Sequence, residues 1–199
     1  ASLAPSEMCI RDRRWALQEL EAAANSGATA CVCLGDIIDR NATASECVPQ
    51  VRTVLDRAVE LFNEVHFISG NHDTHHELDF PPEVTVHSTQ VHTFQIGETT
   101  VLSAAAATDP DLRRLQLPPR PSDAPFLGLL HSSVTGEFSH AICLPLSVDQ
   151  LRACGADAWI LGHVHSPLTL ADAPFIGWVG MGNGLLFDPD TCHVTRLPN

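Results

Sequence analysis

Four different short polar motifs lie along this chain, and each directly follows an apolar run about as long as a β-strand. They are Gly-Asp-Ile-Ile-Asp at 35–39, Gly-Asn-His-Asp at 70–73, His131, and Gly-His-Val-His at 162–165. A helical pattern separates the first two runs, and the order strand, helix, strand predicts an α/β sheet. In such sheets, ligand-binding groups gather beyond the carboxyl ends of the strands. We therefore expect the four motifs to meet at one edge of a sheet.

Apolar periodicity places the remaining elements. Helical spacing of apolar residues predicts helices at 15–26 and 51–62. A capping-box pattern, in which Gln follows Ser after three residues, predicts a short helix at 147–154. Residues 108–124 are rich in Pro, Asp and Arg and are expected to form an irregular surface loop. Short apolar runs predict strands at 29–34, 65–69, 84–87, 91–96, 100–104, 126–130, 157–161, 175–179, 185–187 and 193–197.

The size and hydropathy of the chain fit one globular domain. It has 199 residues, of which 44% are hydrophobic, and this is enough for one well-buried core. No run of about 18 apolar residues that could cross a membrane is present, and the first residues lack the pattern of a secretory signal. We therefore expect a cytoplasmic protein with no membrane partner.

The charge of the chain argues against an independent nucleic-acid binder. All 11 basic residues are Arg, and the formal net charge is −13. A chain that holds nucleic acid by itself normally carries a basic stripe that neutralises phosphates, and this sequence has none. Part of the negative charge belongs to carboxylates of the polar motifs, where bound cations would offset it.

The polar motifs carry the donor groups that a pair of divalent metal ions needs. The carboxylate of Asp36 follows a Gly and can bridge two cations, and Asn71 offers a neutral amide oxygen. Three imidazoles complete the set, and the i, i+2 spacing of His163 and His165 places both rings on one side of an extended segment. Taken alone, a Gly-x-Asp motif or a single histidine such as His131 is more often structural than functional. The ordered set predicts a dinuclear site for hard-to-borderline metal ions.

Two residues of the second motif stand apart from these ligands. Beside a metal-bound phosphate, an imidazole oriented by a carboxylate can stabilise developing charge or protonate a leaving alkoxide. We therefore predict that His72 and Asp73 are catalytic residues of a metal-dependent hydrolase. Most other histidines are expected to be structural or on the surface, and a few in loops are open to substrate contact: His66, His87, His92 and His193 in the first group, and His75, His76 and His140 in the second.

In this order the motifs resemble the signature of the calcineurin-like metallophosphoesterase superfamily. That signature runs Asp-x-His, Gly-Asp-x-x-Asp, Gly-Asn-His-Asp/Glu, His and Gly-His-x-His, and four of its five parts are intact in this sequence. The resemblance implies an α/β fold, namely a four-layer α/β/β/α sandwich that here lacks its first strand. It also implies a phosphoesterase that works with two divalent metal ions, usually Mn, Fe or Zn.

Carried over residue by residue, the resemblance assigns the metal ligands. Asp36 would bridge the two ions, Asn71, His131 and His163 would complete one site, and His165 would belong to the other. By the same analogy His72 would be the catalytic imidazole. Asp39 would be a weak ligand or would lie behind the ligands.

Within the superfamily, three segments are similar to the SbcD-like DNA repair exonucleases. These are Gly-Leu-Leu-His at 128–131, the run at 140–151, and Asp-Ala-Trp-Ile-Leu-Gly-His at 157–163. The narrower resemblance implies hydrolysis of phosphodiester bonds in DNA by a two-metal mechanism, with Mn as the favoured metal. It also implies an SbcC-like ATPase partner, which would supply the grip on DNA that this acidic chain lacks.

One part of the signature is absent, since no Asp-x-His precedes Asp36. The first strand and its two ligands are therefore missing, and we expect impaired activity. Because residues 6–13 have the look of translated sequencing adaptor, we expect residues 1–12 to be a non-native or disordered segment, and residues 13–199 to form a single metallophosphoesterase domain. Two alternatives stay open: a phosphatase or small-molecule phosphodiesterase of the same superfamily, and a non-catalytic remnant that retains one metal site.

Overall fold

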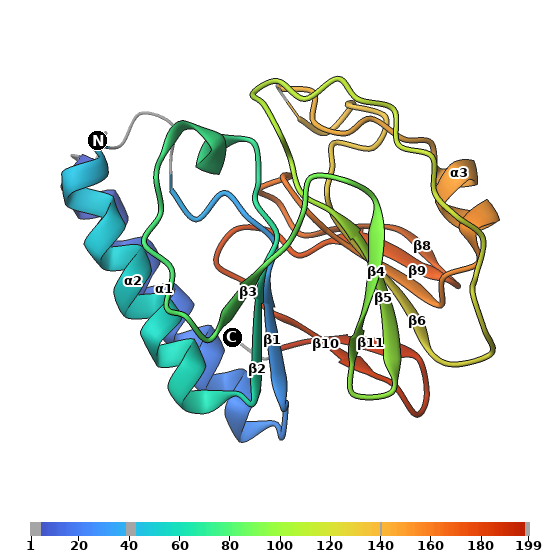
Figure 1. The fold of residues 1–199 in the computed structure, drawn as a ribbon, viewed down its shortest axis with the longest axis horizontal. Helices are drawn as coiled ribbons and strands as arrows, with labels where there is room; N and C mark the ends of the chain where they lie inside the picture. The colour runs from blue at the N-terminus through green and yellow to red at the C-terminus, as the bar shows by residue number, and fades with distance from the viewer. Residues whose placement is uncertain (1–4, 39–42, 140, 198–199) are drawn as a thin grey trace.

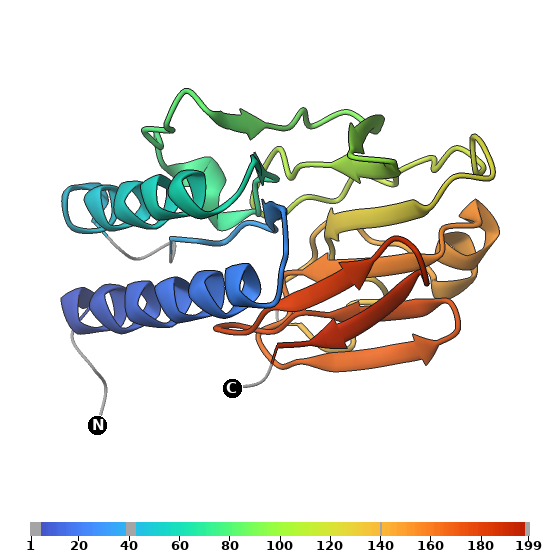
Figure 2. The same ribbon diagram turned by 90° about the horizontal axis from the view of Figure 1, so that it is seen from below.

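The computed structural model describes residues 5–38, 43–139 and 141–197, and it arranges them in four layers. Helices α1 and α2 lie side by side on one face of a three-stranded sheet (Figures 1 and 2). A six-stranded sheet covers the other face, and α3 lies beyond it. This order of layers confirms the predicted α/β/β/α fold class.

The helices and strands have the following bounds. The helices are α1 (Pro5–Asn25), α2 (Ala44–Leu61), the 3-10 helix η1 (His72–His75) and α3 (Val148–Cys154). The strands are β1 (Ala30–Cys33), β2 (Glu64–Phe67), β3 (Val84–Val86), β4 (His92–Ile96), β5 (Thr99–Ala104), β6 (Phe126–His131), β7 (Ala158–Gly162), β8 (Leu168–Asp172), β9 (Phe175–Trp178), β10 (Leu185–Asp188) and β11 (His193–Arg196).

The first sheet has the order β1-β2-β3 with parallel pairing throughout. The apolar face of α2 packs on it through buried residues at helical spacing, among them Val51, Leu55 and Ala58. Among the described strands, β2 is the one neighbour of β1, so β1 stands at an edge of this sheet. The other edge is β3.

The second sheet has the order β4-β5-β6-β7-β9-β8, and its four central strands run parallel. Strands β5 and β6 are buried along their whole length, and the nearly continuous apolar sequence of β6 is typical of a strand covered on both faces. On the α3 side the core is built around the indoles of Trp159 and Trp178, which have no solvent exposure. Strands β10 and β11 form a separate antiparallel pair.

The helix predicted at 147–154 is present as α3, with the predicted residues at both of its ends. Ser147 Oγ accepts a hydrogen bond from the backbone N–H of Gln150 at 3.1 Å, and Gln150 Oε1 accepts one from the N–H of Ser147 at 2.8 Å. Gly155 ends the helix in the left-handed conformation with φ of 79°. The capping box and the terminating Gly are both confirmed.

In several places the structure differs from the predicted elements. Strand β8 was not predicted, and its pairing with β9 includes a register shift. Helix α1 begins at Pro5 and α2 at Ala44, both earlier than the predicted helices. Residues 108–124 contain no helix or strand, as predicted, but Asp111 and Leu115 of this loop are buried. No described helix is long and apolar enough to cross a membrane.

Three histidines form a continuous chain where the two sheets meet. His66 Nδ1 lies 3.0 Å from His87 Nε2, and His87 Nδ1 lies 3.0 Å from His92 Nε2. The ring of Phe94 stacks on that of His87 with centroids 3.9 Å apart. His66 comes from β2 of the first sheet, and His92 from β4 of the second. The chain therefore joins the sheets, in agreement with the structural role expected for these histidines.

This histidine chain predicts acid sensitivity of the fold. Burial, followed by the neighbouring His66 and His92, lowers the pKa of His87 to about 4, against 6.5 for an ordinary histidine. The unfolded chain therefore takes up this proton first, and the free energy of unfolding falls as the pH drops from about 6.5 to about 4. Urea unfolding at pH 7 and pH 5 measures the effect. In the His87→Gln variant the free energy of unfolding should depend less on pH than in wild type. In His193→Gln, a change at an exposed position, the pH dependence should equal that of wild type. An unchanged dependence in His87→Gln would contradict this assignment.

Candidate metal centre

The ends of four strands bring the predicted motifs together at one place in the fold. Asp36 follows β1, Asn71 follows β2, His131 is the last residue of β6, and His163 comes directly after β7. Strands β6 and β7 pair in parallel with His131 opposite Gly162, which places the two imidazoles next to each other. As predicted, groups from all four motifs meet beyond the carboxyl ends of parallel strands.

Glycine is required where the first two motifs approach each other. A Cβ atom on Gly35 would lie 2.1 Å from the backbone nitrogen of Gly70, and one on Gly70 would lie 2.2 Å from Asp36 Oδ1. Both distances are far below van der Waals contact. In addition, Gly35 has a φ of 78°, in the left-handed region that L side chains rarely adopt. The two glycines therefore allow the loops after β1 and β2 to touch.

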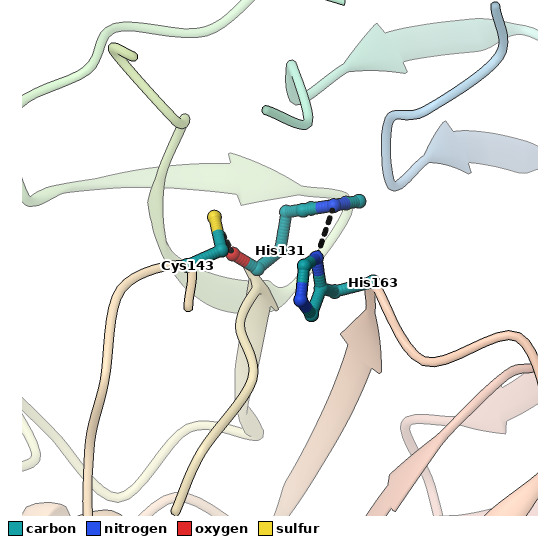
Figure 3. Close-up of side chains that lie close together, drawn as sticks. All are labelled: His131, Cys143 and His163. Atoms are coloured by element: carbon teal, nitrogen blue, oxygen red, sulfur yellow. Dashed lines mark hydrogen bonds between the residues drawn. The ribbon is translucent and has the colours of Figure 1, made fainter. Parts of the chain in front are cut away.

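The central contacts join four polar side chains. His131 Nε2 lies 3.0 Å from Asp36 Oδ2 and 3.2 Å from Asn71 Oδ1. His163 Nδ1 lies 3.0 Å from Asn71 Oδ1 and 3.2 Å from His131 Nε2. Figure 3 shows the two imidazoles approaching nearly edge to face. Asn71 and His131 have no solvent exposure, so these contacts lie in the interior.

Outer contacts fix the tautomers of the two imidazoles. His131 Nδ1 lies 2.6 Å from the carbonyl oxygen of Leu34, which can only accept, so this nitrogen carries the proton. His163 Nε2 lies 3.0 Å from the carbonyl oxygen of Ala141 and is a donor for the same reason. In the neutral rings, His131 Nε2 and His163 Nδ1 therefore present lone pairs to the centre.

These lone pairs face other hydrogen-bond acceptors, namely oxygens of Asp36 and Asn71. The centre therefore lacks the protons or the cation that would make all of these contacts attractive. A proton on His131 Nε2 satisfies Asp36, but Asn71 Oδ1 and His163 Nδ1 still face each other with lone pairs only. One cation among the four groups removes the conflict. Two ligand atoms bound about 2.1 Å from the same cation lie roughly 3.0 to 3.4 Å apart, as these atoms do. The donor set thus fits a borderline divalent metal ion.

The electrostatics of the centre agree with this arrangement. Burial raises the pKa of Asp36, but contacts with His131 and His72 outweigh burial and hold it at about 2. Burial lowers the pKa of His131, but the Asp36 carboxylate more than compensates, and the net shift is upward. For His163, burial and then the neighbouring His131 lower the pKa. Asp36 is therefore ionised and His163 neutral near pH 7, which are the forms that bind metal, whereas the upward shift of His131 favours a proton on Nε2 that a bound cation would displace.

Asp73 joins the loops that carry the first two motifs. Its Oδ2 accepts hydrogen bonds from the backbone N–H groups of Asp36 and Gly70, each at 2.8 Å, and its Oδ1 accepts one from Ile37 at 3.1 Å. Burial, and next the charge of Asp36, raises the pKa of Asp73 to about 6. These contacts place Asp73 beneath the loops, where it sets the position of Asp36.

His72 lies beside the cluster near the surface. Its backbone N–H donates to Asp36 Oδ1 at 2.9 Å, and its Nδ1 lies 3.8 Å from Asp36 Oδ2. The side chain is 14% exposed, so the imidazole can be reached from solvent. It is therefore placed where a group bound at the centre would meet it.

Two other predicted site residues are Asp39 and His165. Asp39 lies outside the described residues. The imidazole of His165 is exposed, and within the described part of the chain the central contacts do not include it. The backbone at His163 has a φ of 93°, so the segment is not extended as the i, i+2 spacing had suggested. For this reason the two rings need not share a side.

Three residues near the cluster were not singled out by any motif. Cys143 Sγ lies within 4.8 Å of the His131 and His163 nitrogens, and its thiol donates to the carbonyl oxygen of His131 at 3.2 Å (Figure 3). Ser139 Oγ lies 2.7 Å from His163 Nε2. Asp109 Oδ1 accepts from Asn71 Nδ2 at 2.9 Å. All three come from loops without regular spacing, and only a prediction of contacts between distant loops could have found them.

Comparisons with known proteins identify the family of this chain. The family model described as "Calcineurin-like phosphoesterase" matches residues 8–167. The uncharacterized metallophosphoesterase YhaO of Bacillus subtilis (strain 168) is 27% identical over 162 residues, which are 73% of this chain and 39% of that protein. The chain thus spans about two fifths of the length of this relative.

Two solved structures share the fold. TT1561 of Thermus thermophilus aligns with a TM-score of 0.53 and 11% identity over 91% of both chains. A second crystal structure aligns with a TM-score of 0.55 and 12% identity over 89% of this chain and 90% of the other. The family match covers all four polar motifs. The chain belongs to the calcineurin-like phosphoesterase family, whose members are metal-dependent phosphoester hydrolases.

Proposed function

We propose that this chain hydrolyses phosphodiester bonds, with DNA as the candidate polymer, and that Mn is the metal it uses. The observation that carries the proposal is the convergence of Asp36, Asn71, His131 and His163 with their lone pairs directed inward. Such a centre takes a divalent cation, and a cation beside the solvent-accessible His72 suits a phosphate group.

Each residue has a definite part in this proposal. Asp36, Asn71, His131 and His163 would hold one ion, and Asp36 together with His165 would contribute to a second. Asp39 would be a weak ligand or would support the other ligands. Bound divalent ions act as Lewis acids toward phosphoryl oxygens and neutralise their charge.

His72 is the proposed proton donor of the reaction. Its side chain is partly exposed, and its Nδ1 lies 3.8 Å from a carboxylate oxygen of Asp36. An imidazolium at this position can stabilise charge on the phosphate and protonate the leaving alkoxide. Asp73 serves the reaction indirectly, because its carboxylate holds the loops on which Asp36 and His72 stand.

The charge of the chain shapes the proposal for DNA. With a net charge of −13 and no Lys, this chain offers little attraction to a phosphate backbone. We therefore propose that a partner, of the kind of an SbcC-like ATPase, holds the DNA while this chain cleaves it.

A specific observation favours a second candidate, a remnant that binds one ion. His165 is exposed and stands outside the central contacts of the described residues, so the second position is less complete than the first. This difference predicts one tightly bound ion and impaired turnover. A phosphatase or small-molecule phosphodiesterase with the same centre is the other alternative.

Assays with three substrates in the presence of Mn²⁺ separate these functions. We expect slow hydrolysis of bis-p-nitrophenyl phosphate and of linear DNA, and slower hydrolysis of p-nitrophenyl phosphate. The His131→Ala variant should lose all of this activity, whereas His193→Ala should retain it. Faster hydrolysis of the monoester would favour a phosphatase. One bound ion per chain without His131-dependent turnover would favour the remnant and contradict the catalytic proposal.

A further inference from the structure

The side-chain amide of Asn71 can serve the centre in only one of its two orientations. Its oxygen and nitrogen have nearly the same shape, but only the oxygen has lone pairs for a cation. In the flipped orientation the NH2 group would face His131 and His163 and would repel the ion. Something must therefore select the orientation in which Oδ1 points inward, and the ligands themselves cannot do so before metal binds.

Asp109 makes this selection through the other end of the amide. Its Oδ1 lies 2.9 Å from Asn71 Nδ2. A carboxylate only accepts hydrogen bonds, so the amide nitrogen must face Asp109 and the oxygen must face the centre. The Asp109 side chain is 5% exposed and Asn71 is fully buried, so water does not compete for this contact.

The second oxygen of Asp109 is held from the surface side. Its Oδ2 lies 3.2 Å from His75 Nε2, and the His75 side chain is half exposed. His75 ends the short helix η1, which begins directly after Asn71, and Thr74 Oγ1 of the same helix donates to the carbonyl oxygen of Asn71 at 2.7 Å. Each oxygen of the Asp109 carboxylate thus has a partner. Asp109 and Asn71 are 38 residues apart in sequence.

We propose that Asp109 is a positioning residue of the metal centre, which orients the Asn71 amide for metal binding and is itself held in place by His75. This inference rests on the proposed metal-binding function of the centre. It assigns Asp109 an effect through hydrogen-bond geometry, and it differs from a general attraction between a negative charge and the cation. The two possibilities predict different behaviour for Asp109→Asn.

Metal affinity of the purified chain tests the proposal. Titration calorimetry with Mn²⁺ and the visible spectrum of the Co²⁺-loaded protein are the readouts, and thermal unfolding checks that each variant is folded. Removal of a partner that orients a metal ligand costs roughly 10–100-fold in affinity, so Asp109→Ala should bind Mn²⁺ that much more weakly and show an altered Co²⁺ spectrum. Asp109→Asn still offers an oxygen to Asn71 Nδ2 and should retain most of the affinity. Equal losses in both variants would overturn the proposal in favour of charge alone.

A double-mutant cycle keeps the test independent of the alanine variant. Asn71→Asp alone places two carboxylates opposite each other and should weaken binding, whereas Asn71→Asp combined with Asp109→Asn restores a donor and an acceptor without changing the net charge. We expect the combined variant to bind Mn²⁺ more tightly than Asn71→Asp. Additive effects of the two changes would contradict the coupling.

Two controls separate this inference from the proposed function. Asp157→Ala removes a partly buried carboxylate that contacts Arg120 and the backbone of Phe126, so it should lower stability without changing metal affinity. Asn71→Ala should lose tight binding. If wild type and Asn71→Ala bind metal equally, the proposed metal centre is wrong. If Asn71→Ala loses binding but Asp109→Ala does not, only the role of Asp109 is wrong.

Discussion

Replacing His131 by Ala is expected to abolish tight metal binding. The imidazole is fully buried, and its Nε2 contacts both Asp36 and Asn71. Since loss of a residue that merely orients a ligand costs roughly 10–100-fold in metal affinity, loss of the ligand itself should exceed roughly 100-fold. Calorimetric titration with Mn²⁺ and Zn²⁺ measures the effect, with His193→Ala on β11 as the exposed control.

The same variant should also be less stable without metal. Removal of one partner from a buried charged pair costs about 3–5 kcal/mol, because the remaining charge is left without compensation. Here the carboxylate of Asp36, only 12% exposed, would lose the contact with His131. Metal affinity like that of wild type in His131→Ala would show that the central contacts are not ligand contacts.

Replacing Asp73 by Ala is expected to disturb the fold and the centre together. Three backbone N–H groups, those of Asp36, Ile37 and Gly70, would lose their acceptor. A buried donor without a partner costs about 1–3 kcal/mol, so the free energy of unfolding should fall by about 3 kcal/mol or more. Because Asp36 stands on one of the released loops, metal affinity should fall as well.

Urea unfolding measures this loss, and Asp79→Ala provides the control. Asp79 is also an acidic residue, but its side chain is 71% exposed and pairs with Arg52 on the surface. Exposed pairs contribute about 0–1 kcal/mol, so this control should remain close to wild type. A loss below about 1 kcal/mol in Asp73→Ala would mean that the two loops are held by other contacts.

The elements and the motif positions could be predicted because their signals are local. The unbroken apolar runs of β6 and β7 indicate buried parallel strands, and they place His131 and His163 at strand ends without any knowledge of the fold. The capping box of α3 is complete within four residues of sequence. The division of the ligands between two metal sites rested on the resemblance. The structure joins four of the predicted ligands, Asp36, Asn71, His131 and His163, by contacts of 3.0–3.2 Å.

The remaining features depend on contacts between distant segments. Strand β8 exists because it pairs with β9, and its own sequence gives a weak strand signal. Asp109 lies in a loop whose composition indicates only irregular structure, yet its carboxylate reaches Asn71. His163 has a positive φ of 93°, so the segment is not extended there and the i, i+2 spacing does not decide on which side His165 lies. Long-range geometry of this kind is what the sequence leaves open.

The position of β1 has a consequence for the behaviour of the chain in solution. Within the described sheet, Ala30–Cys33 pairs only with β2, so its outer edge presents backbone N–H and C=O groups without a strand partner. Such edges readily accept a strand from another molecule, and natural proteins discourage this with Pro or charged residues. The sequence Ala-Cys-Val-Cys offers neither. This edge is therefore a place where a strand of another molecule can add to the sheet.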